Sequence, residues 1–162
     1  MAAVAAKDET ELACVVIPLG TTQLLLPNVS VAEIIPWRRL KAWDASPDWC
    51  IGLLGWRGEA VPVLDFESLC GSDAPRAERG RCLLIMNRAR SSVGRPFYSL
   101  VSAGLPRLVH LTAADMESHP IRLGDSEVAS VMVGTEQAVV PNLSFIEERL
   151  ASLPEETIRI EG

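Results

Sequence analysis

The stretch "GLLGWRGEAVPVLDF", residues 52–66, places an apolar run on either side of one Trp-Arg-Gly triplet. Short apolar runs bounded by Gly, Pro or Asp are typical of β-strands. A single cation, Arg57, stands where the two runs meet. The segment therefore predicts two consecutive strands whose connecting turn carries an arginine.

Similar runs rich in Val, Ile and Leu recur along the chain and predict roughly nine or ten short strands. Several are apolar on both faces, as expected for strands that wall a core shared by two layers. The fold class predicted from this pattern is mainly β. The candidate strands cover 11–20, 22–27, 31–37, 50–56, 59–66, 81–88, 96–103, 105–111, 127–134 and 136–142.

Helical signal is sparse, and its clearest instance is "LSFIEERLASLP" at 143–154. Apolar residues follow helical spacing, Ser144 and Glu147 have the spacing of a capping box, and Pro154 ends the run. This predicts a C-terminal amphipathic helix with Glu147 on its exposed or capping face. Shorter helical turns are expected after Ser46, Asp65 and Thr112, with Asp65 as a helix cap.

The composition limits the classes of function. The chain has 162 residues, 48% of them hydrophobic, which suits one globular domain or two small ones sharing a core. Its net charge of −6 argues against nucleic acid or an anionic membrane as the main partner. The sequence shows neither a secretory signal nor a membrane-spanning run, so we expect a cytoplasmic protein. The polar segments 71–80 and 88–95 predict surface loops.

Catalytic signatures are missing. The chain has no G-x-x-x-x-G-K-[ST], G-x-G-x-x-G, H-E-x-x-H or G-x-S-x-G motif. His110 is expected on a strand surface and His119 in a loop. The scattered cysteines predict buried free thiols and no metal site, and these are Cys14, Cys50, Cys70 and Cys82. We therefore expect no enzyme activity and no cofactor.

The opening stretch belongs to a longer pattern, "SPDWCIGLLGWRGEAVPVLDFESLCG" at 46–71. It has a Pro-x-aromatic turn, an Ile-Gly strand entry, an Arg-Gly turn, and Val-Pro-Val-Leu-Asp before a short helix. This resembles the CheW-like family of bacterial chemotaxis coupling adaptors, in register and without a gap. The segments "SVAEIIP" and "SLVSAGLPRLVHLTAADM" extend the resemblance over roughly residues 11–153.

The resemblance implies a fold and a function. The fold is two small five-stranded SH3-like β-barrels that share an apolar core and are closed by the C-terminal helix. The family has no catalytic activity and tethers the regulatory domain of a CheA-type histidine kinase to the cytoplasmic tips of methyl-accepting chemoreceptors. We expect a disordered segment at 1–10, a CheW-like domain at 11–153 and a tail at 154–162.

The resemblance also implies a receptor-facing groove that contains Arg57. A guanidinium on a rigid turn suits a partner's carboxylate or carbonyl groups. Alternatively, Arg57 pairs with a carboxylate of its own chain, and both roles are compatible. The other expected groove residues are Val31, Glu33, Gly52, Leu105 and Leu108. Gly52 has a second interpretation, as a strand bend or a close backbone approach.

The chain also departs from the family pattern. Gly55 replaces the usual Asn and Trp56 the usual Leu, and "WRRLKAW" at 37–43 is an unusual aromatic and basic cluster. These changes suggest a divergent adaptor, of the kind found in pilus-linked chemosensory systems. Two alternatives stay open. One is a small β-barrel that binds a ligand or nucleic acid through this cluster, and the other is a former domain of a larger kinase.

Overall fold

The computed structural model describes residues 11–44, 46–71, 81–87, 96–118, 125 and 127–153. Within these residues the chain is mainly β. The strands are β1 (Leu12–Pro18), β2 (Gln23–Pro27), β3 (Val31–Pro36), β4 (Cys50–Trp56), β5 (Glu59–Leu64), β6 (Cys82–Asn87), β7 (Phe97–Ser102), β8 (Arg107–Leu111), β9 (Met116–Ser118), β10 (Glu127–Val133) and β11 (Glu136–Pro141). The helices are α2 (Phe66–Leu69) and α3 (Leu143–Ala151), with 3-10 turns η1 (Asn28–Ser30) and η2 (Ala113–Asp115).

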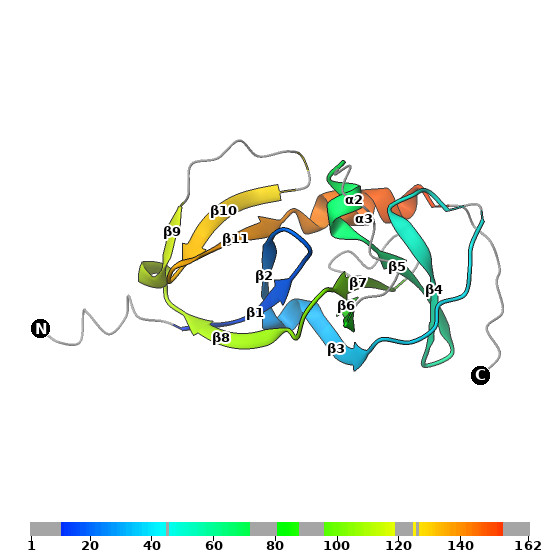
Figure 1. Cartoon of the computed structure of the whole chain (residues 1–162), viewed down its shortest axis with the longest axis horizontal. Coiled ribbons are helices and arrows are strands. Elements are labelled where there is room, and N and C mark those ends of the chain that lie inside the picture. Colours follow the sequence, from blue (N-terminus) through cyan, green and yellow to red (C-terminus); the bar gives the residue numbers. More distant parts are fainter. Residues whose placement is uncertain are drawn as a thin grey trace, which may run out of the picture.

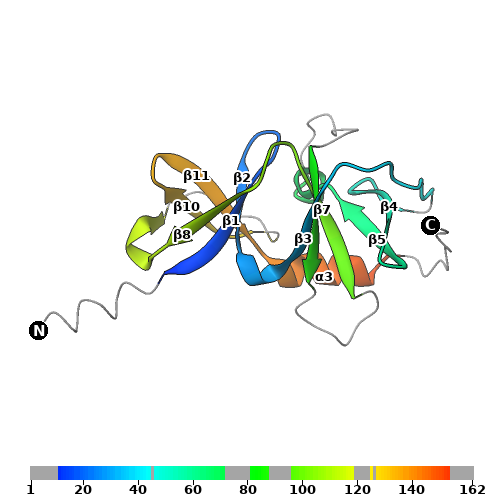
Figure 2. The ribbon, with the colours of Figure 1, turned by 90° about the horizontal axis from the view of Figure 1, so that it is seen from below.

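The strands form two sheets that lie side by side along the long axis of the molecule (Figures 1 and 2). The terminal sheet has the order β8-β1-β2-β11-β10-β9, and the central sheet has the order β3-β6-β7-β5-β4. Neighbouring strands are antiparallel except for two parallel pairs, β11 with β2 and β5 with β7. Because the chain leaves the terminal sheet after β2 and returns to it with β8, the two sheets are intertwined in sequence.

A shared core joins the two sheets. The terminal sheet contributes Val15, Ile17, Leu24, Leu26 and Val139, and the central sheet contributes Leu53, Leu64, Leu84, Met86, Tyr98 and Leu100. Helix α3 follows β11 and runs along the central sheet, adding Ile146 and Leu150 to this core (Figure 2). Each sheet buries its other face in a smaller core of its own. This explains why strands such as β6 are apolar on both faces.

The predicted fold class is confirmed, since the chain is mainly β with two small sheets, a common core and a C-terminal helix. All of the predicted strands are present. The terminal sheet has one further short strand, β9, which the sequence did not indicate. Its segment Met-Glu-Ser has no alternating apolar pattern, so it is pairing with β10 that makes it a strand.

The start of α3 differs from the prediction. The N-cap is Asn142, whose side-chain oxygen accepts a hydrogen bond from the Phe145 backbone N–H at 3.2 Å. Ser144 therefore lies inside the helix, and the predicted capping box with Glu147 is wrong. Glu147 is also only 5% exposed, which contradicts its predicted place on an exposed face. Asn142 follows directly after β11, so the helix begins as soon as the strand ends.

The shorter elements agree with the sequence in most places. Asp65 caps α2 by accepting from the Glu67 backbone N–H at 3.2 Å, and η2 forms after Thr112 as expected. The predicted helical turn after Ser46 is instead a hydrogen-bonded turn, in which the Cys50 N–H donates to the Pro47 carbonyl.

The four cysteines are thiols that form no disulfide within the described residues, and the buried ones are Cys14, Cys50 and Cys82. Burial raises the pKa of the Cys14 thiol, which keeps it protonated and unreactive. Cys70 is exposed, contrary to the prediction. It is the C-cap of the short helix α2, which ends at the surface.

Some predictions fall outside the described residues. They are those for residues 1–10, 72–80, 88–95 and 154–162 and for His119, so the expected domain bounds stay predictions. His110 is exposed on β8, as expected. None of the helices in the described part of the chain has the length and hydrophobicity needed to span a bilayer.

At Gly52 the backbone of β4 passes close to the preceding segment, at Leu40 and Lys41. It is buried next to a bulge in β4, with a φ of +155°. A Cβ at this position would lie 2.8 Å from the Lys41 carbonyl oxygen and 3.1 Å from the Leu40 Cβ. Lys41 and Leu53 exchange two backbone hydrogen bonds of 2.8 and 2.9 Å, which fix this approach. The structure therefore gives Gly52 the backbone role that was its second interpretation.

We expect Gly52→Ala to lower the free energy of unfolding by about 2–4 kcal/mol, because it combines backbone strain with a clash against main-chain atoms. Urea unfolding followed by circular dichroism measures the change. The matched control is Gly58→Ala, at a φ of +76° with no atom within 4 Å of the added Cβ. The control should cost only the strain of about 1 kcal/mol. Equal losses for the two variants would contradict the crowding at Gly52.

Candidate partner-binding surface

The hairpin between β4 and β5 presents Arg57 on a stiff turn. Trp56 pairs with Glu59, so Arg57 and Gly58 form a two-residue loop. Both have positive φ, 48° and 76°, as the tight hairpin turns that match strand twist require. A non-glycine residue at such a φ is strained by about 1–2 kcal/mol. The side chain of Arg57 is 72% exposed, so the turn holds a guanidinium out in solvent.

The neighbours of Arg57 form a polar cluster with Trp56 and Glu33. The Trp56 indole N–H donates to Glu33 Oε2 at 2.7 Å, and Arg57 Nη2 lies 3.6 Å from the same oxygen. The Arg57 guanidinium carbon also lies 4.6 Å from the centroid of the Trp56 ring, within the range of a cation-π contact. Arg57 therefore pairs within its own chain, as one of its two predicted roles requires. Its exposed guanidinium stays accessible, and the contact with a partner stays a prediction.

Strand β3 separates this polar cluster from an apolar region. Glu33 pairs with Ile85, whose side chain belongs to the core of the central sheet. Ile34 pairs with Leu84, whose side chain belongs to the shared core. Directly paired residues on antiparallel strands point to the same face. Glu33 thus lies on the face of the central sheet that carries its own smaller core, as Trp56 does. Ile34 lies on the opposite face, which meets the terminal sheet.

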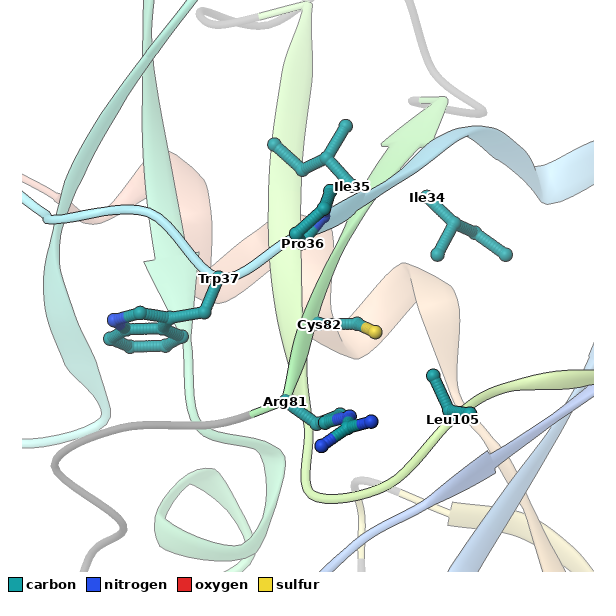
Figure 3. A pocket seen from close by; sticks show the side chains of 7 residues that line it. All are labelled: Ile34, Ile35, Pro36, Trp37, Arg81, Cys82 and Leu105. Carbon is teal, nitrogen blue, oxygen red and sulfur yellow. The ribbon is translucent and has the colours of Figure 1, made fainter.

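The junction carries exposed apolar side chains. Ile34 is 44%, Leu105 64% and Leu108 56% exposed. Ile34 and Leu105 line an open pocket together with Ile35, Pro36, Trp37, Arg81 and Cys82. Figure 3 shows Ile34 and Leu105 on one side of this pocket, Trp37 on the other, and Arg81 and Cys82 between them. Exposed apolar groups beside a cation are typical of protein interfaces.

Leu108 and Val31 belong to the same junction. Leu108 pairs with Val15 of the shared core, so its side chain points to the face of the terminal sheet that meets the central sheet. Val31, at the start of β3, is partly buried and packs against the shared core. Together with Ile34 and Leu105, these residues form what we call the junction patch.

The structure therefore divides the predicted groove residues into three groups. Val31, Leu105 and Leu108 belong to the junction patch, and Glu33 and Arg57 form the polar cluster with Trp56. Gly52 is buried and apart from both. Ile34 is not among the site residues predicted from the sequence, because its place in an apolar strand gives no signal that it is exposed.

The aromatic and basic segment at 37–43 does not form a stacking surface. Trp43 is 6% exposed and belongs to the shared core, and Trp37 packs partly buried against the core of the central sheet. Arg38, Arg39 and Lys41 are exposed. With one of its two aromatic rings buried, the segment lacks the pair of rings on which the nucleic-acid alternative depended.

Comparison with known proteins identifies the family. A family model described as "CheW-like domain" matches residues 13–143. The chain belongs to the CheW-like domain family. The crystal structure of the scaffolding protein TtCheW from Thermoanaerobacter tengcongensis is similar, with a TM-score of 0.66 and 14% sequence identity over 82% of this chain and 90% of that chain. A search of curated proteins found no match.

Membership of the CheW-like family confirms several predictions. The two sheets correspond to the SH3-like subdomains of the CheW-like fold. CheW-like proteins are scaffolding adaptors of chemotaxis signalling and are not enzymes. The fold, the adaptor function and the non-enzymatic nature expected from the sequence are therefore confirmed, while the individual partner-binding residues stay predictions.

We expect Glu33→Ala to destabilise the fold more than Arg57→Ala. Removing Glu33 leaves the indole N–H of a tryptophan that is 5% exposed without its acceptor, which costs about 1–3 kcal/mol. Removing Arg57 breaks an ion pair between exposed groups, worth about 0–1 kcal/mol. Urea unfolding of both variants tests this order. A larger loss for Arg57→Ala would show that the arginine, and not the indole, is the main partner of Glu33.

Proposed function

We propose that this chain couples chemoreceptors to a histidine kinase, by binding the cytoplasmic tip of a methyl-accepting receptor and the regulatory domain of a CheA-type kinase. Membership of the CheW-like family supports this proposal. The observation that carries the receptor contact is the exposed Arg57 on its stiff hairpin turn, on the same sheet as part of the junction patch. The proposed site of action is the cytoplasmic side of membrane-associated receptor arrays.

The junction patch and the polar cluster would have different tasks in receptor binding. Exposed leucines such as Leu105 supply apolar area that is removed from water when a partner docks. The guanidinium of Arg57 would set the orientation of the bound partner, because its planar fork of donors suits a carboxylate. Of the predicted groove residues we retain Val31, Arg57, Leu105 and Leu108 for receptor contact, with Glu33 as the residue beside Arg57 that sets its availability. Gly52 contributes by shaping β4.

We expect Arg57→Ala to weaken binding of a receptor-tip fragment at least tenfold and to change binding of the kinase regulatory domain by less than about twofold. Isothermal titration calorimetry of the full chain with each partner measures both. Arg149→Ala is the matched control, because Arg149 also lies over an aromatic ring, 5.0 Å from the Phe145 centroid, but on α3. Equal loss of both partners on Arg57→Ala would refute the receptor assignment. Binding of neither partner by the folded, unmodified chain would refute the coupling function itself.

A second test concerns the junction patch. We expect Leu105→Thr to change the free energy of unfolding by less than about 0.5 kcal/mol, because the side chain is mostly in solvent. The same variant should weaken receptor-tip binding about tenfold by removing apolar contact area. Val128→Thr is the control, since Val128 is 59% exposed against 64% for Leu105 but lies on β10. Equal effects of the two variants on binding would show that the junction patch has no special role.

A further inference from the structure

Glu33 has two partners that differ in strength and in exposure, a hydrogen-bond donor and an ion-pair partner. The Trp56 indole N–H lies 2.7 Å from Oε2, whereas the nearest Arg57 nitrogen lies 3.6 Å from the same atom. Trp56 is 5% exposed, and the side chain of Arg57 is 72% exposed. The short hydrogen bond is therefore to the buried group, and the long, loose contact is to the group that a partner can reach.

The Trp56 indole is held in place by an aromatic contact on the core side. The Trp56 ring meets the Phe97 ring edge to face, with centroids 4.7 Å apart and planes at 74°. Both rings pack in or against the core of the central sheet, so this packing holds the indole with its N–H towards Glu33. Because the contact with Phe97 is edge to face, a face of the Trp56 ring also supports the guanidinium of Arg57.

This arrangement lowers the free energy needed to break the contact between Arg57 and Glu33. A carboxylate that loses its only charged partner in a half-buried site is destabilised, and it would hold that partner back. Here Glu33 also accepts the indole hydrogen bond, whose donor is held by the core of the central sheet and not by the guanidinium. A partner's carboxylate that approaches Arg57 therefore competes only against a loose, solvent-screened contact.

Resting on the proposed function, we propose that Trp56 is a positioning residue that holds Glu33 so that Arg57 passes readily from Glu33 to a carboxylate of the bound partner. Trp56 itself touches no partner, since it is buried. The proposal assigns to the partner a carboxylate at the point where Arg57 docks. It also makes Glu33 a local competitor whose strength is set by the indole.

The first experiment needs no partner. The exchange of the Trp56 indole proton with solvent is followed by 1H-15N NMR of the full chain, with the signal assigned from its loss in Trp56→Phe. In Arg57→Ala the proton should stay about as protected as in the unmodified chain, because its bond to Glu33 persists. Exchange in Arg57→Ala as fast as in Glu33→Ala would overturn the proposal, since Glu33 would then depend on Arg57 for its position.

The second experiment is a double-mutant cycle on binding of the receptor-tip fragment. Trp56→Phe keeps an aromatic ring beneath Arg57 but removes the donor, so Glu33 should hold Arg57 more tightly and binding should weaken about fivefold or more. Adding Glu33→Gln removes the competing charge and should return the affinity to within about twofold of that of Glu33→Gln alone. Urea unfolding of each variant accompanies the cycle to show that it is folded.

The outcomes of the cycle are distinct. If the double variant binds as weakly as Trp56→Phe, the loss came from damaged packing, and the proposal is wrong. If the unmodified chain does not bind the fragment at all, the proposed function fails, and the exchange measurement on the free chain still decides whether Trp56 holds Glu33 without Arg57.

Discussion

The contact between the two sheets across one shared core determines the rest of the structure. The inner faces of both sheets lie against each other, and α3 adds Ile146 and Leu150 to the same core. Neither sheet would bury this face alone, so each depends on the other for a large part of its apolar stabilisation. Polar contacts add precision. The Glu67 carboxylate on α2 accepts from the backbone N–H groups of Gly20 and Thr21 at 2.7 and 3.2 Å, which ties the β1–β2 turn to the central sheet.

This packing also explains where apolar side chains stay exposed. The chain crosses between the sheets after β2 and again after β7, and the Ala103 N–H donates to the Pro18 carbonyl at the second crossing. Ile34 and Leu105 lie at this margin, just beyond the region that the shared core covers. A surface next to a rigid core loses little conformational entropy when a partner docks, which favours binding there.

Much of the fold could be predicted from the sequence because its strands are short, apolar and clearly bounded. Asp65 could be identified as a cap, since it directly precedes a short run ending in Gly71. Properties that depend on tertiary contacts could not be predicted. The burial of Glu147 depends on which helix face meets the core, and β9 depends on its pairing with β10. The likeness to the CheW-like family suggested the candidate surface residues, which stay predictions. Only the folded structure shows that Gly52 is buried and that Trp56 contacts both Glu33 and Arg57.

The two parts of the candidate surface would bind a partner through different interactions, apolar contact at the junction patch and electrostatic attraction at Arg57. Apolar contact at the junction patch depends on area and on the geometry set by the shared core, and it is insensitive to salt. The contribution of Arg57 is electrostatic and short-ranged at physiological ionic strength, where charges more than about 8 Å apart are largely screened. An adaptor built in this way can keep its docking position through the junction patch while its selectivity among partners is set at Arg57. Because Trp56 contacts both Glu33 and Arg57 from within the fold, changes at this buried position would alter partner choice without changing any residue on the surface itself.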